Sequence, residues 1–418
     1  MLDLKFIREN ATLVKKNVES KNESADIDEI LMLDERRRSI IQEVEQLKNQ
    51  RNIVSKEIAN LKKQGLDAEE KIQAMKDVSD TIKNYDDELR TVEEQLQKNL
   101  LRVPNMLHSS VPIGKTADDN IVIRSWGEQI ANKSKNHIEI AKELGILDFE
   151  RGAKVSGTGF TFYVGKGSAL ERALISFMLD YHCSKHGYKE IMPPFIVNKE
   201  SMIGTGQIPK LEEDMYFVES DNLYLIPTAE VPITNYHSGE ILKAEDLPIK
   251  FCGYSPCFRR EAGSYGKDTR GFLRVHQFNK VEMVKYSLPE NSYEELESLT
   301  NDAEDIFKQL GLAYRVVLLS SGDTSFSSAK TYDLEAWSPG EQKWLEVSSC
   351  SNFEDFQARR ANIRFKRTAS SKPEFVHTLN GSGLATSRLI VALLETYYEN
   401  GKVIVPEVLR DYCKFDEI

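Results

Sequence analysis

The sequence has little of what marks secreted, zinc-clustered or membrane proteins. Its 418 residues include five cysteines, and no two of them form a CxxC pair. Disulfide frameworks and structural zinc clusters need closely spaced cysteines, so we expect neither, and we expect a cytoplasmic protein. No stretch reaches the ~20 apolar residues of a membrane-spanning helix. Charged residues interrupt the apolar positions at the start, so no cleaved signal sequence is expected.

Positive charge is also in short supply. The formal net charge is -11, with 55 Lys and Arg against 66 Asp and Glu. A general nucleic-acid-binding surface is therefore excluded, and any RNA contact must be confined to local basic patches. The length predicts roughly two or three domains with a large core.

Helical periodicity dominates the first hundred residues. Ten positions step by three and four, and eight of them are aliphatic: Ile30, Leu33, Arg37, Ile40, Val44, Leu47, Arg51, Val54, Ile58 and Leu61. After a break at Lys63-Gln64-Gly65 the same stepping returns at Met75, Val78, Ile82, Tyr85, Leu89, Val92 and Leu96. This pattern predicts two helices of ~35 residues that fold back into an antiparallel arm ~50 Å long.

Periodicity alone favours an oligomerisation or spacer role for this arm. A basic edge in the distal half of the first helix indicates another role, because lysine and arginine there could meet phosphates. The edge consists of Lys48, Arg51, Lys56, Lys62 and Lys63, and Glu57, Glu69 and Glu70 dilute it.

The stretch from Tyr254 to Glu282 predicts a long β-hairpin. Alternation in an extended strand turns Arg259 and Glu261 to one face, and Phe258 and Arg260 to the other. The turn from Ala262 to Gly271 has the composition of a mobile polar loop, with three glycines and with Lys267, Asp268 and Arg270. Beyond it, one face is apolar (Leu273, Val275, Val281, Met283) and the other is polar with one aromatic (Arg274, His276, Phe278, Lys280, Glu282).

The polar face suits a ligand that has an anion, an amine and a flat ring, such as an aminoacyl-adenylate. A guanidinium grips phosphate or carboxylate, Phe278 offers a stacking surface, and carboxylates accept from N–H groups. Composition alone favours a simpler interpretation, an amphipathic hairpin with a salt-bridged outer face, because surface charges are usually only solvated.

The exact amino-acid sequence of the hairpin decides between these two interpretations. FRREAGS, DTRG and FLRVHQFNKVE closely resemble motif 2 of class II aminoacyl-tRNA synthetases, in the version of the seryl-tRNA synthetase family. The resemblance implies an α+β protein, an antiparallel sheet flanked by helices. It divides the chain into a tRNA-binding domain with the arm (1–102) and a catalytic domain with motifs 1, 2 and 3 (103–418). In this family the arm clasps the long variable arm of the tRNA.

The same resemblance assigns ligand contacts along motif 2. Arg259 would hold the reacting phosphate and carboxylate, Glu261 would accept from the adenine amine, and Phe278 would stack on the ring. Arg260 belongs to the ATP-binding set by its place in the motif, although it stands where many relatives have serine and alternation points it away from the site. Glu282 would accept from the hydroxyl or ammonium of serine.

Two further segments resemble the family before and inside the catalytic core. A helical stripe over 168–187 runs into YKEIMPPFIV and is similar to motif 1, which implies a homodimer. The segment LYLIPTAEVPIT resembles the TxE loop that holds the ammonium of serine, which implies roles for Thr228, Ala229 and Glu230 on an extended piece.

The C-terminal third carries the remaining site residues. Two strands with a turn at Pro339-Gly340 end in Glu346-Val347-Ser348-Ser349, where the resemblance implies ATP contacts, with Glu346 and Ser349 as ligands of Mg²⁺. We interpret the adjacent Cys350 as a packing residue. A glycine-rich turn then leads into a helix, and GLATSR resembles motif 3, in which Arg388 contacts the ATP tail and Ser382 and Asn380 line the serine pocket.

The implied activity is activation of L-serine by ATP and transfer to the 3′ end of tRNA(Ser), with Arg259, Arg388 and Glu261 at the catalytic centre. Whether tRNA(Sec) is charged too stays open. Three rivals remain: a class II-like ligase that loads a carrier protein, a threonyl- or prolyl-tRNA synthetase, and a catalytically dead coiled-coil protein. The helical arm counts against the carrier-protein ligase. The lack of an anticodon-binding domain after Arg410 and of zinc-ligand clusters counts against the threonyl- and prolyl-tRNA synthetases, and the intact motif residues count against the catalytically dead protein.

Overall fold

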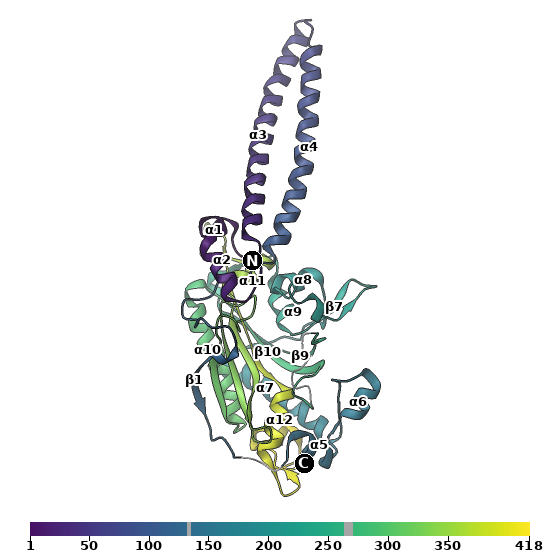
Figure 1. The fold of residues 1–418 in the computed structure, drawn as a ribbon, viewed down its shortest axis with the longest axis vertical. Coiled ribbons are helices and arrows are strands. Elements are labelled where there is room, and N and C mark those ends of the chain that lie inside the picture. The colour runs from purple at the N-terminus through teal and green to yellow at the C-terminus, as the bar shows by residue number, and fades with distance from the viewer. Residues whose placement is uncertain (132–134, 263–270) are drawn as a thin grey trace. The chain divides into compact units, whose positions relative to one another are not determined.

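The computed structural model describes residues 1–131, 135–262 and 271–418 (Figure 1). They form two compact units. One comprises Leu2–Glu19 and Glu23–Pro104, and the other comprises Met1, Ser20–Asn22 and Asn105–Ile418. The predicted polar loop with Lys267, Asp268 and Arg270 lies outside the described residues. None of the described helices combines the length and the hydropathy that crossing a membrane requires.

The first unit contains the predicted helical arm. Two short helices, α1 (Leu4–Glu9) and α2 (Ala11–Ser20), precede the long pair α3 (Ile27–Lys63) and α4 (Glu69–Leu100), which run antiparallel in Figure 1. Every predicted seam position is buried or half-buried, as expected for a core only two helices wide. Ion pairs such as Arg36–Glu88 and Arg37–Glu93 link the two helices along the flank. The prediction of an antiparallel arm is confirmed.

The second unit is built on a large antiparallel sheet. Among the described residues, eight strands follow the order β1-β11-β12-β13-β16-β10-β9-β4, and every neighbouring pair is antiparallel except β9 with β4. Their bounds are β1 Ile121–Trp126, β4 Lys189–Glu190, β9 Ile249–Phe258, β10 Gln277–Ser287, β11 Tyr314–Leu318, β12 Lys330–Ser338, β13 Lys343–Asn352 and β16 His377–Ala385. This is the expected α+β fold with an antiparallel sheet.

Three long helices cover the sheet and bury its apolar side chains: α7 (Lys166–His186), α10 (Ser292–Gln309) and α12 (Thr386–Tyr397). Shorter elements complete the unit: α5 His137–Leu144, α6 Phe149–Ser156, α8 Lys199–Thr205, α9 Glu230–Thr234, α11 Phe356–Ala361, α13 Glu407–Cys413, β2 Leu147–Asp148, β3 Phe162–Tyr163, β5 Ile196–Asn198, β6 Phe217–Val218, β7 Leu223–Leu225, β8 Ile241–Lys243, β14 Arg364–Lys366, β15 Glu374–Phe375, β17 Tyr398–Glu399 and β18 Lys402–Val403. The predicted core face of the hairpin is confirmed, because Leu273, Val275, Val281 and Met283 are all buried.

The prediction of a glycine-rich turn before α12 is wrong. Residues 377–385 form β16, an interior strand between β13 and β10. Its glycines serve packing, because a Cβ at Gly381 would lie 2.4 Å from Leu299 of α10, and one at Gly383 would lie 2.4 Å from His182 of α7. Local composition indicates a turn, but the contacts that require small residues come from helices distant in the sequence.

Two smaller expectations also need correction. The predicted strand through Arg259 and Glu261 ends at Phe258, and Glu261 has a φ of +53°. The TxE segment is not extended, because the Glu230 N–H donates to Thr228 Oγ1 at 3.1 Å and α9 begins there.

Candidate active site

A cavity of about 490 Å³ opens on the face of the sheet away from α7 and α10. Most of the predicted site residues line it: Thr228, Glu230, Arg259, Glu261, Phe278, Glu282, Glu346, Val347, Ser349, Asn380, Ser382 and Arg388. They come from the start of α9, from the residues that follow β9, and from β10, β13, β16 and the start of α12, segments that lie far apart in the chain. The tertiary structure therefore brings Arg259 and Arg388 to one pocket.

Arg259 and Phe278 form one wall of the cavity. The Arg259 guanidinium carbon lies 5.1 Å from the centre of the Phe278 ring, and its Nε donates to the Pro227 carbonyl at 3.2 Å. Its backbone N–H donates to the His276 carbonyl, which continues the pairing of the two segments beyond the end of β9. The side chain is thus held against an aromatic face at the cavity wall.

Glu261 also lines the cavity, and its carboxylate forms an ion pair with Arg274. Both side chains are largely buried. Sequence alternation had placed Arg274 on the polar face without a role. Its guanidinium orients the carboxylate that the motif assigns to the adenine amine.

Another part of the cavity is a buried acidic pocket. Thr228 Oγ1 donates to Glu282 at 2.9 Å, and Lys280 pairs with the same carboxylate at 2.5 Å. Gln357 Nε2 donates to Glu230 at 2.7 Å. Burial, together with the nearby charge of Glu282, raises the pKa of Glu230 to about 7. This pocket favours an added cation, because a cation would offset the cost of holding two carboxylates together.

Arg388 is fixed by two backbone carbonyls. Its Nε donates to Leu273 O at 3.0 Å, and its Nη1 donates to Glu346 O at 2.8 Å and approaches the Glu346 carboxylate at 3.3 Å. It lies in the first turn of α12 and reaches the segment that leads into β10 through Leu273.

A β-bulge brings Glu346 and Ser349 to the same face. Residues three apart in a regular strand point in opposite directions. In β13, however, the register to β12 shifts by one residue between Glu346 and Ser348, so Val347 is extra and both side chains line the cavity.

The donor set at the bulge fits the Mg²⁺ that the family implies. Asp333 pairs with Ser349 across the strands, and among the described residues its buried Oδ1 has no hydrogen-bond partner. Burial, with the charge of Glu346 next in importance, raises the pKa of Asp333 well above its usual value. Carboxylate and hydroxyl oxygens in this grouping are the ligands that Mg²⁺ prefers.

Some of the predicted site residues are not among those that line the cavity. The Arg260 guanidinium stacks over Tyr216 at 5.9 Å from the ring centre, on the side that alternation indicated. Ala229 is fully buried, and the Ser348 hydroxyl donates to the Ser382 carbonyl at 2.7 Å. Cys350 is fully buried, and burial raises the pKa of its thiol to about 12, as befits a packing residue.

The sequence analysis gave no role to three residues that contact the predicted site residues. Lys280 shares the polar face of the hairpin with Phe278 and Glu282, so alternation could have identified it. Gln357 and Asp333 gave no local signal, because they act through partners more than a dozen residues away.

Comparisons with known proteins agree with this geometry. The family model of the tRNA synthetase class II core domain (G, H, P, S and T) matches residues 216–397, and that of the seryl-tRNA synthetase N-terminal domain matches residues 1–107. The "Serine--tRNA ligase" of Chloroherpeton thalassium is 57% identical over 420 residues, covering 99% of this chain and 98% of that protein. The chain belongs to the seryl-tRNA synthetase family.

Other members and solved structures agree. The Carboxydothermus hydrogenoformans "Serine--tRNA ligase" is 56% identical and covers 100% of this chain and 99% of its own. The crystal structure of the Pyrococcus horikoshii seryl-tRNA synthetase complexed with ATP superposes with a TM-score of 0.95 at 41% identity, covering 100% of this chain and 99% of that one. The family resemblance of the motifs and the class II fold are both confirmed.

Membership also bears on the rival interpretations. A carrier-protein ligase and a threonyl- or prolyl-tRNA synthetase share the core but would not match the seryl-tRNA synthetase N-terminal domain over the arm. The Giardia lamblia prolyl-tRNA synthetase, at 18% identity and a TM-score of 0.57, shares the fold alone.

Proposed function

We propose that this protein is a serine–tRNA ligase. It activates L-serine with ATP to seryl-adenylate and pyrophosphate, and then transfers serine to the 3′ end of tRNA(Ser). The observation that carries the proposal is the single cavity that joins an arginine-and-aromatic end to a buried acidic end. An adenylate has a phosphate and a purine at one end and an aminoacyl ammonium at the other.

The first step is an in-line displacement at the α-phosphorus of ATP. A carboxylate oxygen of serine attacks, the bond to the bridging oxygen breaks, and pyrophosphate leaves with the electron pair. Arg259 and Arg388 stabilise the negative charge on the phosphoryl oxygens, and their anchoring to carbonyls before ligand binds lowers the reorganisation required. Glu261 accepts from the adenine amine and Phe278 stacks on the ring.

The acidic end selects serine. Glu230 accepts from the substrate ammonium, and Thr228, Glu282, Asn380 and Ser382 surround the small side chain. Glu282 accepts from the serine hydroxyl. Alanine leaves that carboxylate without a donor, and a site built to pair a hydroxyl rejects an analogue that lacks it.

Mg²⁺, held by Glu346 and Ser349 with Asp333 behind them, supplies charge neutralisation for the triphosphate when bound. The arrangement of these oxygens beside Arg388 supports that assignment. Val347 and Ser348 contribute backbone to the same wall.

The remaining partners follow from the family. The domain with the arm (1–102) binds tRNA(Ser), and the catalytic domain (103–418) forms a homodimer through α7 and the strand after it. The protein acts in the cytoplasm. Charging of tRNA(Sec) is a second outcome that the same aminoacylation assay measures with the other tRNA.

The test is amino-acid-dependent exchange of pyrophosphate into ATP, run with all twenty amino acids. Serine alone should support exchange. Arg259→Ala should lower it by about 10²–10³-fold at unchanged melting temperature, because one preorganised charge at the phosphoryl group is removed. Arg260→Ala, an adjacent arginine outside the cavity, is the matched control and should retain exchange within about threefold. Equal losses in both variants, or exchange with threonine or proline instead of serine, would contradict the proposal.

A further inference from the structure

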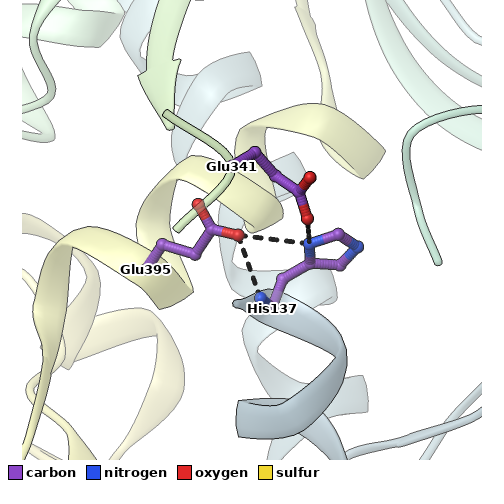
Figure 2. A group of neighbouring side chains, drawn as sticks. All are labelled: His137, Glu341 and Glu395. Atoms are coloured by element: carbon purple, nitrogen blue, oxygen red, sulfur yellow. Dashed lines mark hydrogen bonds and ion pairs between the residues drawn. The ribbon is translucent and has the colours of Figure 1, made fainter. Parts of the chain in front are cut away.

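A buried cluster beside the active site joins three segments of the second unit. His137, at the first position of α5, faces Glu395 of α12 and Glu341 of the turn between β12 and β13 (Figure 2). Its Nδ1 lies 3.2 Å from Glu395 Oε1 and 3.6 Å from Glu341 Oε1, and its backbone N–H donates to the same Glu395 oxygen at 2.9 Å. The side chains of His137 and Glu395 are fully buried.

The other ring nitrogen of His137 determines what the cluster does. The backbone N–H of Phe272 donates to Nε2 at 3.3 Å, so Nε2 carries a lone pair and the neutral ring bears its proton on Nδ1, towards Glu395. A metal bound to Nδ1 would require the ring proton to be on Nε2. That proton would then face the backbone N–H of Phe272, and two donors cannot form a hydrogen bond with each other. The geometry therefore favours a hydrogen-bonding link over a metal site.

Glu395 is itself held in place. Its second oxygen accepts from the Ser338 hydroxyl and from the Gly340 N–H at 2.9 Å. The segment at Phe272 packs tightly on the imidazole, because a Cβ at Gly271 would lie 2.2 Å from His137 Nε2. The link from α12 through His137 to Phe272 is thus rigid at both ends.

This link runs parallel to a contact of the active-site arginine. Arg388 lies seven residues before Glu395 on α12, two helical turns away on the same side. Its Nε donates to the carbonyl of Leu273, the residue after Phe272. Helix α12 therefore holds the Phe272-Leu273 segment at two points, once through His137 and once through Arg388.

We propose that His137 is a positioning residue for ATP: it fixes Phe272, and thereby the Leu273 carbonyl that orients the Arg388 guanidinium. The inference rests on the proposed function only in taking the cavity as an ATP site. His137 is not among the residues that line the cavity, and its hydrogen bond to Phe272 connects it to the Leu273 carbonyl that holds Arg388. Its loss should therefore weaken ATP recognition and leave serine recognition unchanged.

The test compares two substitutions of His137 by amide side chains of similar polarity but different length. In His137→Gln the amide reaches the position of Nε2 and can accept from Phe272, whereas in His137→Asn it reaches only the position of Nδ1. Ile140→Ala, on the same helix and fully buried, controls for loosening of α5. The readouts are the Kd of Mg·ATP by calorimetry, the KM values of ATP and serine in exchange, and the melting temperature.

We expect His137→Asn to weaken ATP binding about tenfold or more while the KM of serine stays within about twofold. His137→Gln should bind ATP within about threefold of the wild type. Ile140→Ala should lower the melting temperature without changing the KM of ATP more than the KM of serine. The proposal is overturned if the two amides bind ATP equally, if Ile140→Ala reproduces the ATP defect, or if metal analysis finds an ion that leaves with His137. The calorimetry tests the role of His137 even if the enzyme activates an amino acid other than serine, because it measures the binding of ATP without any amino acid.

Discussion

Glu230 shows how one side chain's surroundings set its chemistry. It is buried beside Glu282, and burial first and that neighbouring charge second raise its pKa to about 7. The residue is therefore only partly ionised near neutral pH before a ligand binds. An incoming ammonium would favour the ionised form, so serine binding should draw a proton off the protein.

The raised pKa predicts a pH-dependent effect of Glu230→Gln. The folded state favours the protonated carboxyl, so its contribution to stability is fully present below the unfolded pKa of about 4.5 and is lost as pH rises through about 7. Glutamine mimics the protonated form. We expect the variant to stay within about 1 kcal/mol of the wild type near pH 5 and to exceed its free energy of unfolding by on the order of 3 kcal/mol at pH 8.5.

Chemical denaturation at the two pH values measures this difference, and the KM of serine should rise in the same variant because a neutral amide pairs poorly with an ammonium. Glu200→Gln, at an exposed position of α8, is the control and should show no pH-dependent difference from the wild type. A variant that is less stable than the wild type at pH 8.5 would contradict the assignment.

At the scale of elements, β16 is where packing and the site meet. One face of this strand carries Asn380 and Ser382 into the cavity, and the other presents Gly381 and Gly383 to the covering helices. The glycines let α10 and α7 approach the sheet closely. The position of the serine pocket therefore depends on residues that never face it.

Gly381→Ala should destabilise the protein because its new Cβ would overlap Leu299 at 2.4 Å and Cys350 Sγ at 2.7 Å. We expect a loss of about 1–3 kcal/mol in the free energy of unfolding, typical of overpacking. Leu299→Ala by itself should also destabilise, by about 2–5 kcal/mol. In the double variant the losses should be less than additive, because the shortened leucine makes room for the methyl group. Strict additivity in denaturant titrations would show that the two sites do not share this space.

At the scale of the whole molecule, the two units suggest separable tasks. The cavity and its supporting residues all lie in the unit that contains Asn105–Ile418, whereas the arm belongs to the other. Lys56, Lys62 and Lys63 are exposed on the arm, and Glu57 is paired with Lys71. Exposed lysines are the residues through which such an arm would meet phosphates.

Replacing residues 26–100 by a short glycine-serine linker should leave serine-dependent pyrophosphate exchange within about threefold of the wild type. Transfer to tRNA(Ser) should fall by about a hundredfold or more, because the contacts that hold the tRNA are removed. Parallel exchange and aminoacylation assays measure the two steps. Reversing the charge of Lys56, Lys62 and Lys63 in the full chain should reproduce the transfer defect alone, and normal charging by either variant would refute the role of the arm.

Local periodicity was enough to predict the arm and the core face of the hairpin, because both depend on which side chains repeat along one element. The motif sequences were enough to predict that Arg259, Glu261, Phe278 and Arg388 lie around one cavity. The same local logic failed at the glycines of β16, where composition indicated a turn.

What the chain alone could not specify is which side chains meet. Alternation along a strand puts Glu346 and Ser349 on opposite faces, and only the extra residue opposite β12 turns them together. The pairing of Gln357 with Glu230, and of His137 with Phe272 and Glu395, joins positions more than a hundred residues apart. Residue spacing encodes the direction of a side chain within its own element, whereas contacts between elements arise only when the sheet and helices pack.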